Sequence, residues 1–577
     1  MHRRRSAAGR FRTAVLACAG ALACSFVTHP AAQQLPDAGG LRQGIERERL
    51  ETPRPQVRPP EPAPRPLTGP REGELSVRVQ VFTLSGNTLV ATERLLAALS
   101  GFLQRPLSFA DLQLAASTVA DVYRADGWVV RTVLPPQDLS SGTVRIEIVE
   151  ARFGRVRIEN KETLDQLRVG EDRLLGIAGF ALTAGAPIRS DDIDRVLRLL
   201  DELPGVAAQG RLAPGEGDGV TDLVLSVKDK PIVGGDVRID NHGSRSTGKI
   251  RVAANLSVAS PLRMADRLGF YALHTEGSDY VRAAYSLPAG YSGLYAGVNA
   301  SAMRYRLVGS DFVALQARGA SDTTAAELLY PLLRLRDANA TIGATVERKT
   351  FDNESGGAVT TRYAVDTGTL TLSGNRQDGI GGGGVWLGNI ALVAGDVDLS
   401  GSPNQAADAL TTRSAGNFQK LRYALSRQQA LTESLLLSAS LSGQFASKNL
   451  DSSEKFYLGG ASGLRAYPSS EGGGSEGEML NLELQLRLPQ GFTVSGLYDH
   501  GTVLVNKDNN YTGALAQNRL SMRGLGLALA WANGQGASAR LAWARRLGSN
   551  PNATAVGNDQ DGTLIRNRIW LEAGHAF

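Results

Sequence analysis

The sequence predicts a membrane β-barrel of about 16 antiparallel strands, preceded by two small α+β domains. Three observations support this class. Residues 231–577 carry short alternating apolar and polar runs with almost no helical periodicity. Upstream, the element order β-α-α-β-β occurs twice between residues 75 and 229. The chain also opens with an export signal, and no later stretch reaches the apolar length of a membrane-spanning helix.

Residues 1–32 read as a secretory signal peptide, with a basic start, an apolar stretch from Ala14 to Val27 and small residues at Ala31-Ala32. An amphipathic N-terminus and lipoprotein processing at Cys24 are the alternatives. Cys18 and Cys24 are the only cysteines and both lie in this segment. The mature chain is therefore expected to have no disulfide and no thiol chemistry.

The net charge does not point to a nucleic-acid partner. The chain has 62 Lys and Arg against 57 Asp and Glu, and five of the arginines lie in the first 12 residues. Without them the two totals are equal, so we expect no nucleic-acid partner on grounds of charge.

Two short segments follow the signal. Residues 33–51 include a weakly helical stretch, Leu41 to Leu50. Residues 52–74 contain eight prolines, which favour an extended, semi-rigid linker. The alternatives for this linker are a disordered tether and an arm that holds the helix at a set distance.

The first α+β domain is expected over residues 75–151. Its second helix should be capped by Ser108 and ended by Gly127. The predicted elements are a strand from Leu75 to Ser85, helices over Thr92–Ser100 (with Thr92 as cap) and Phe109–Asp126, and strands over Trp128–Leu134 and Val144–Val149.

The second domain is expected over residues 152–229 and repeats the same order. The predicted elements are a strand around Val156 and Ile158, helices over Leu164–Ile177 and Ser190–Glu202 (the second with a capped start at Ser190), and strands over Val206–Leu212 and Thr221–Val227. One fused α+β domain without a repeat is the alternative.

Residues 230–577 are predicted to form the barrel. In the run 480–488 every second residue is leucine, and the residues between them are Asn481, Glu483, Gln485 and Arg487. A soluble sandwich also alternates in this way. The export signal, the chain end and the number of such runs favour a barrel with lipid on one face and a wet lumen on the other.

The last strand, Arg566 to Phe577, places Ile569, Leu571 and the terminal Phe577 in one phase, which His575 interrupts. A chain that ends on Phe after an alternating strand resembles the C-terminal signal by which outer-membrane barrels are recognised for insertion. A chance terminal Phe is the alternative.

A glycine-rich stretch at about 456–478 separates two alternating strands and carries Arg465. So many glycines exclude a regular strand or helix. A guanidinium fits a carboxylate through two hydrogen bonds, so the stretch is predicted to be a loop that folds into the barrel and places Arg465 there. A surface loop with a solvated arginine is the alternative.

Taken together, these features resemble the TpsB transporters of two-partner secretion in the Omp85 superfamily. The two α+β domains resemble POTRA domains, and residues 82–88 resemble the usual end of a first POTRA strand. Leu464-Arg465-Ala466-Tyr467 resembles the tetrad at the tip of the family's inward loop, although Ala466 replaces the glycine common in relatives.

A second motif, Leu497 to Gly501, resembles the family's aromatic-Asp-x-Gly signature through Tyr498, Asp499 and Gly501. In relatives this aspartate lies on an inner barrel strand and pairs with the loop arginine. The resemblance therefore implies that Asp499 is the wall partner of Arg465.

The resemblance implies an outer-membrane translocator with its POTRA domains in the periplasm. These would capture one large unfolded exoprotein, haemolysin- or adhesin-like, and the barrel would export it without ATP, with the early helix as a plug. Outer-membrane lipids and the barrel-assembly machinery would be further partners. A barrel-assembly factor and a passive porin are the alternatives, and the sequence leaves the cargo open.

Enzymatic readings find little support. The six histidines have no metal-ligand spacing, and Gly460-Ala461-Ser462-Gly463 lacks the pattern of a nucleophile elbow. Asp191, Asp192 and Asp194 fit a helix start better than paired catalytic acids. We therefore expect no enzyme, no cofactor and no metal.

Overall fold

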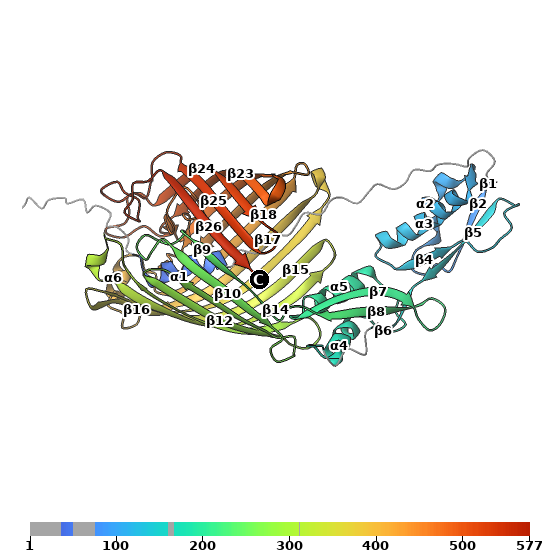
Figure 1. Cartoon of the computed structure of the whole chain (residues 1–577), viewed down its shortest axis with the longest axis horizontal. Helices are drawn as coiled ribbons and strands as arrows, with labels where there is room; N and C mark the ends of the chain where they lie inside the picture. The colour runs from blue at the N-terminus through green and yellow to red at the C-terminus, as the bar shows by residue number, and fades with distance from the viewer. Residues whose placement is uncertain (1–35, 50–75, 160–166, 311) are drawn as a thin grey trace, which may run out of the picture.

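The computed structural model describes residues 36–49, 76–159, 167–310 and 312–577. The predicted signal peptide (1–32) and proline-rich linker (52–74) lie outside these residues. Figure 1 shows a barrel and two small domains arranged in a row along the long axis of the molecule. None of the helices in the described part of the chain is long and apolar enough to cross a bilayer.

The first domain packs two helices against a sheet in the order β2-β5-β4, in which β2 and β5 are parallel. Tyr123, Leu95 and Ile146 are fully buried in its core. Its elements are β1 (Ser76–Arg78), β2 (Val81–Ser85), α2 (Thr92–Ala98), β3 (Pro106–Ser108), α3 (Phe109–Ala125), β4 (Val130–Val133) and β5 (Thr143–Glu150).

Two predictions for this domain are wrong in detail. The single strand predicted from Leu75 is divided, because β1 pairs with β3 whereas β2 pairs with β5. Thr92 is the first residue of α2, and the residue before it, Ala91, makes no side-chain cap. Ser108 does cap α3, where it forms a reciprocal capping box with Asp111.

The second domain has the same layers, with the sheet order β6-β8-β7. Residues 167–170 are not helical and the first helix starts at Glu171, while the predicted start at Leu164 lies outside the described residues. The helix α5 begins at Ser190 without a side-chain cap. Its elements are β6 (Arg152–Ile158), α4 (Glu171–Ala181), α5 (Ser190–Asp201), β7 (Val206–Pro214) and β8 (Val220–Asp229).

Backbone hydrogen bonds join the two domains. The Val129 amide donates to the Ile188 carbonyl at 3.0 Å, and the Ile188 amide donates to the Ala151 carbonyl at 2.9 Å. The Arg189 guanidinium also lies 4.9 Å from the ring centre of Trp128. These contacts fix the orientation of the first domain on the second.

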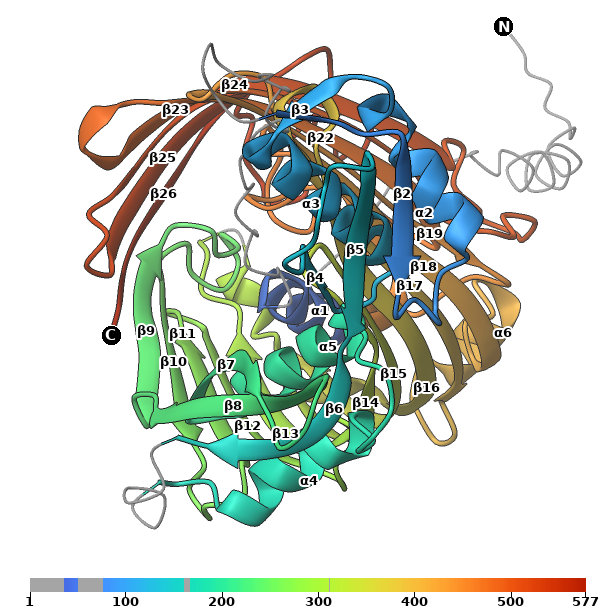
Figure 2. The same ribbon diagram turned by 90° about the vertical axis from the view of Figure 1, so that its right-hand side faces the viewer.

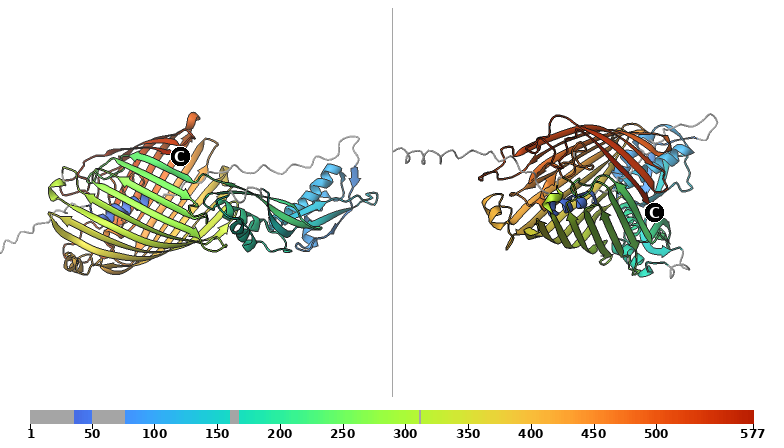
Figure 3. Two further views of the ribbon diagram at one scale, coloured as in Figure 1. Left: turned by 60° about the horizontal axis from the view of Figure 1, so that its bottom comes forward. Right: turned by 60° about the vertical axis from the view of Figure 1, so that its left-hand side comes forward.

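The barrel is closed by 16 antiparallel strands, and β26 pairs with β9. Figures 1 and 3 show the tilt of these strands around the lumen. They are β9 (Val233–Asp240), β10 (Arg251–Ala259), β11 (Arg267–His274), β12 (Ser278–Pro288), β13 (Tyr295–Arg306), β14 (Arg318–Arg334), β15 (Ala338–Ser355), β16 (Ala358–Asp378), β17 (Gly384–Asp398), β18 (Gly416–Ala430), β19 (Leu435–Ala446), β22 (Glu476–Arg487), β23 (Phe492–Leu504), β24 (Arg519–Ala532), β25 (Ala537–Arg546) and β26 (Asn567–Ala576).

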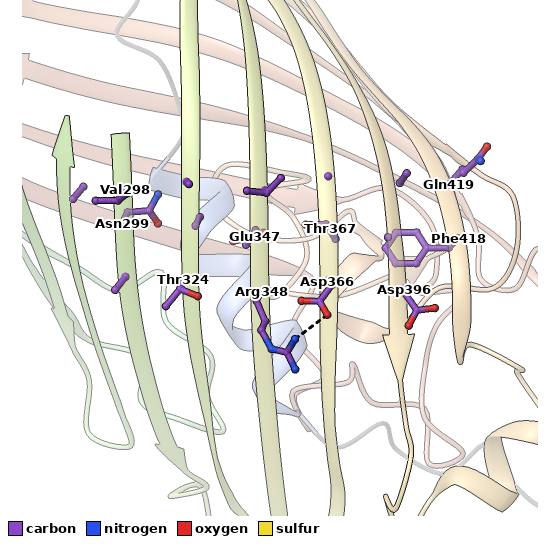
Figure 4. A pocket seen from close by; sticks show the side chains of 18 of the residues that line it. Val298, Asn299, Thr324, Glu347, Arg348, Asp366, Thr367, Asp396, Phe418 and Gln419 are labelled. Carbon is purple, nitrogen blue, oxygen red and sulfur yellow. Dashed lines mark hydrogen bonds and ion pairs between the residues drawn. The ribbon is translucent and has the colours of Figure 1, made fainter. Parts of the chain in front are cut away.

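A polar row on the outer wall marks one edge of the lipid-facing band. Arg348 and Asp366 form an ion pair at 3.2 Å across β15 and β16, along a hollow of about 1410 Å³. In Figure 4 both stand on the opposite side of the wall from Glu347, which lies toward the helix inside the barrel. Ten residues further along β16, Arg376 lies opposite Trp386 of β17 in the strand register. This spacing is the length of a membrane strand, about 10 residues.

One helix, α1 (Ala38–Arg49), lies inside the barrel. Figure 2, along the barrel, shows it surrounded by the ring of strands, and it packs against β13, β14 and β15. It starts three residues before the predicted Leu41. A short helix, α6 (Gln405–Leu410), lies in the connection between β17 and β18.

Candidate functional site in the barrel lumen

The glycine-rich loop between β19 and β22 folds into the lumen. Its two ends pair as β20 (Phe456–Tyr457) and β21 (Gly473–Gly474). The path is tight, because a Cβ at Gly463 would lie 2.0 Å from the Leu458 carbonyl oxygen and one at Gly459 would lie 2.1 Å from the Pro468 carbonyl oxygen. Glycine is therefore required at both positions.

Arg465 sits at the inner end of this loop and is 7% exposed. Its Nη2 donates to Asp499 Oδ1 at 2.6 Å, and both its Nε and its backbone amide donate to Asp499 Oδ2 at 3.0 Å. Asp499 lies on β23 and is 2% exposed. The structure thus brings together the two residues that the resemblance pairs.

A second carboxylate also binds Arg465, and it was not predicted from the sequence. Glu483 on β22 accepts from Arg465 Nη1 at 3.1 Å and lies 3.3 Å from the Arg540 guanidinium on β25. Asn481 donates to Asp499 at 2.8 Å and to the Gly463 carbonyl at 3.0 Å. We call Arg465, Asp499, Glu483, Asn481 and Arg540 the latch cluster.

Glu483 and Asn481 were visible in the sequence as the polar face of the leucine run 480–488. That pattern indicates that they face the lumen but not what they contact. No pattern in the sequence indicated a role for Trp570 on β26. Its indole N–H donates to the Arg465 carbonyl at 2.7 Å, so the last strand of the barrel also holds the loop.

The neighbours of Arg465 in the tetrad are apolar anchors. Leu464, Ala466 and Tyr467 are fully buried and pack with Met479, Val503, Leu520 and Met522. The Tyr467 ring lies 4.8 Å below the Arg546 guanidinium. Gly501 leaves space for the loop, because a Cβ there would lie 2.6 Å from the Leu458 side chain and 3.0 Å from the Leu464 side chain.

The remaining predicted site residues lie on the outer face. Tyr498 is 37% exposed, and it alternates with the inward-facing Asp499, so it does not belong to the lumenal cluster. Ile569, Leu571 and Phe577 are 55%, 51% and 62% exposed. Phe577 exchanges backbone hydrogen bonds with Gly235, so the C-terminal residue helps to close the barrel.

Buried charges hold the first half of α1 against the wall. Arg42 pairs with Glu347 of β15 at 2.8 Å, and Lys349 pairs with both Glu347, at 2.9 Å, and Glu454, at 2.6 Å. Lys420 of β18 reaches Glu454 at 2.6 Å as well. Glu454 belongs to η5 (Ser452–Glu454), which starts the inward loop, so one network joins helix, loop and wall.

The second half of α1 is held by strands nearer the start of the barrel. Glu48 pairs with Arg251 of β10 at 2.6 Å, and Arg251 pairs in turn with Asp240 of β9 at 2.7 Å. Glu46 accepts a hydrogen bond from Tyr280 and lies 3.6 Å from Arg282. The helix therefore bridges strands from the start and the middle of the barrel.

A chamber of about 890 Å³ lies between this assembly and the second α+β domain. The latch cluster residues Arg465 and Glu483 line one side, and Arg198 and Glu202 of α5 line the side that faces the domain. Neutral hydroxyl and amide side chains line much of the remaining wall; they include Ser373, Asn389, Ser426, Ser438 and Ser440.

Two sequence families match this chain. Residues 219–528 match the family described as haemolysin secretion/activation protein ShlB/FhaC/HecB. Residues 77–151 match the POTRA domain of ShlB type.

Related proteins agree with these matches. The heme/hemopexin transporter protein HuxB of Haemophilus influenzae strain 86-028NP is 26% identical over 550 residues, which cover 92% of this chain and 95% of HuxB. The outer membrane transporter CdiB of Dickeya dadantii is 24% identical over 478 residues, which cover 78% of this chain and 81% of CdiB.

Solved structures share the fold. CdiB from Escherichia coli aligns with a TM-score of 0.66 at 20% identity, covering 94% of this chain and 99% of CdiB. BamA from Haemophilus ducreyi, lacking POTRA domains 1–3, aligns with a TM-score of 0.52 at 12% identity, covering 87% of this chain and all of that one. The chain thus belongs to the haemolysin secretion/activation family ShlB/FhaC/HecB, the TpsB-type outer-membrane transporters that secrete partner exoproteins.

Proposed function

We propose that α1 and the inward loop together close the lumen between rounds of export of one large exoprotein, haemolysin- or adhesin-like. In this proposal residues 33–51 are the plug region, 75–151 and 152–229 are the two POTRA domains, and 230–577 form the conducting barrel. The observation that carries the proposal is that α1 is tied by ion pairs to Glu347 of β15 through its first half and to Arg251 of β10 through its second half.

The contacts of α1 suit a plug that must leave. Among its side chains only Ala38 and Ile45 are buried apolar groups. Leu41 is half-buried against the same cluster, and the other side chains that contact the wall or the loop are charged or polar, so water can replace their contacts when the helix departs. A buried ion pair adds little net stability, because desolvation of both charges offsets their attraction. The helix is thus held specifically but weakly.

Capture would occur at a sheet edge of the first POTRA domain. Its edge strands are β2 and β4, and Trp128, just before β4, is bridged to Arg189 of the second domain. This favours β2 as the edge to which an unfolded exoprotein adds a strand. Val81 on β2 is 52% exposed and would contact the added strand.

The chamber beside α5 would receive the captured segment. Its Ser and Asn side chains offer hydrogen bonds to any peptide backbone, which suits an extended chain in transit. Passage beyond the chamber would require α1 to leave and the loop to move from Asp499.

The C-terminal residues serve biogenesis in this scheme. Ile569 and Leu571 face lipid, and Phe577 ends the strand that closes the barrel. We propose that they form the signal read by the barrel-assembly machinery, so that their role is insertion into outer-membrane lipid and not transport.

A reversible cross-link tests the plug. A Cβ at Gly44 of α1 would lie 3.9 Å from Ser470 Oγ and meets no other atom within 4 Å, so Gly44→Cys with Ser470→Cys suits a disulfide. The oxidised double variant should stop secretion and keep conductance low in planar bilayers, and reduction should restore secretion. The two single variants serve as controls. Normal secretion by the fully cross-linked protein would exclude a plug helix that leaves the lumen separately from the inward loop.

A further inference from the structure

The turn between β10 and β11 has an unusually constrained backbone. Ser260, Arg263 and Ala265 all have positive φ values, of 48°, 61° and 60°. The fully buried carboxylate of Asp266 accepts hydrogen bonds from the amides of Leu262, at 3.3 Å, and Met264, at 3.2 Å. Such strain persists only where the surroundings enforce it. The turn therefore holds one fixed shape.

This fixed turn presents apolar side chains to the outside. Leu262 is 63% exposed and Met264 is 46% exposed. By contrast, Ala265 is fully buried in the core of the second POTRA domain. Arg168 of that domain donates to the Ser260 carbonyl at 3.0 Å, so the turn and the domain form one body.

The next turn on this side of the barrel, between β12 and β13, contacts α4. Tyr291 lies directly on Gly176, where a Cβ would come within 2.4 Å of the ring. Arg173 donates to the Gly290 carbonyl at 2.7 Å and stacks 5.5 Å from the Tyr291 ring centre. Phe180 follows Gly176 by one helical turn on the same face of α4 and is 60% exposed.

Leu262, Met264, Tyr291 and Phe180 thus form a set of exposed apolar residues on one rigid body, which we call the apolar rim. It lies at the POTRA ends of β10 to β13. In Figure 2, α4 lies at the edge of the barrel ring next to β12 and β13, whereas α5 lies nearer its centre. The rim therefore continues the lipid-facing wall, where Phe270 of β11 and Val281 of β12 are 44% and 55% exposed.

We propose that the apolar rim docks on the periplasmic phospholipid leaflet of the outer membrane. Tyrosine and phenylalanine beside basic residues are favoured at the level of lipid headgroups. Arg173 suits this position, because its contacts are a carbonyl and a ring and leave its charge available to lipid phosphates. The second POTRA domain is then held by the membrane as well as by the barrel, which keeps α5 beside the chamber.

Spin labels at two matched phenylalanines test this proposal. The mature chain from residue 33 has no cysteine, so Phe180→Cys introduces a single labelling site. Phe109→Cys is the control, because Phe109 is also a helical phenylalanine, is 62% exposed and lies in the first POTRA domain, away from the barrel. Each full-length protein is reconstituted in vesicles of phosphatidylethanolamine and phosphatidylglycerol.

Collisions with lipid-soluble oxygen and with a water-soluble nickel complex are then measured. In vesicles we expect the label at residue 180 to collide more often with oxygen than with the nickel complex, and to lose this preference in lipid-free amphipol. The label at residue 109 should collide more often with the nickel complex in both. Equal nickel collision rates at the two sites in vesicles would overturn the proposal. A low nickel collision rate at residue 180 that persists without lipid would also overturn the proposal, since a protein surface would then cover the rim.

Discussion

Ala466 of the inward loop packs directly against Gly524 of β24. A Cβ built on Gly524 would lie 2.5 Å from the Cβ of Ala466, so the site holds one methyl group and not two. Ala466 is fully buried and is not among the residues with positive φ, so its backbone does not require glycine. The alanine that departs from the family tetrad is therefore accommodated by the glycine opposite it.

This pair gives a prediction with an internal rescue. Gly524→Ala should push the loop from the wall, at a cost of about 1–3 kcal/mol for overpacking. Planar-bilayer recordings should show more frequent openings than in the parent. Adding Ala466→Gly should restore the parental record, because the second methyl group is removed. Gly496→Ala on β23 is the control, since a Cβ there meets no atom within 4 Å; an equal effect in this control would contradict the packing argument.

Arg465→Ala should abolish most secretion and leave the barrel inserted. The substitution leaves Asp499 and Glu483 as two buried carboxylates without their shared partner, and loss of one member of a buried pair costs about 3–5 kcal/mol. We expect the released loop to lie in the path of the exoprotein, because no anchor holds it to the wall, while the 16-strand ladder stays closed. The amount of exoprotein in the medium measures secretion, and the heat-modifiable electrophoretic mobility of the barrel shows whether it is folded and inserted.

Asp499→Asn separates charge from shape. The substitution keeps the size of the side chain and leaves one oxygen that can accept a hydrogen bond. It removes the negative charge that balances Arg465, so secretion should fall here too. Arg348→Ala is the matched control, because it breaks an exposed pair on the outer wall, where such pairs contribute little. Unaffected secretion by both latch variants would show that the latch cluster has no role in transport.

The sequence predicts most of the fold because its patterns are local. Alternation in the run 480–488 assigns Glu483 to the lumen and Leu484 and Leu486 to lipid, and the structure agrees. The Ser108 cap of α3 is equally local. By contrast, the division between β1 and β2 was not predicted, because it depends on the pairing of β1 with β3, which follows β2 and α2 in the chain.

The latch cluster was predicted only in part, for a related reason. The pairing of Arg465 with Asp499 came from a resemblance to known proteins and not from spacing. Glu483, Arg540 and Trp570 join them only because the register of β22, β25 and β26 brings their inward faces to the same height. Nothing in the local sequence of a strand specifies the height at which it meets a loop.

The first POTRA domain contains a carboxylate whose charge the fold needs. Glu150, at the end of β5, accepts from the amides of Thr88, at 2.6 Å, and Leu89, at 2.8 Å, and from the Tyr123 hydroxyl at 2.8 Å. Burial alone would raise the pKa of Glu150, but the hydrogen bonds from Thr88, Leu89 and Tyr123 outweigh it and hold this pKa below its usual value.

The stability of this domain should therefore fall in acid. A depressed pKa contributes stability that is complete above the unfolded-state value, about 4.3, and is lost as the pH falls through the lower folded value. Hydrogen exchange of residues 76–150 in the full chain, corrected for intrinsic rates, should show protection decreasing below about pH 4. Glu150→Gln should lower protection at neutral pH and flatten this decrease, whereas Glu147→Gln, at an exposed position on the same strand, should change neither. An unchanged acid response in Glu150→Gln would assign the loss to other groups.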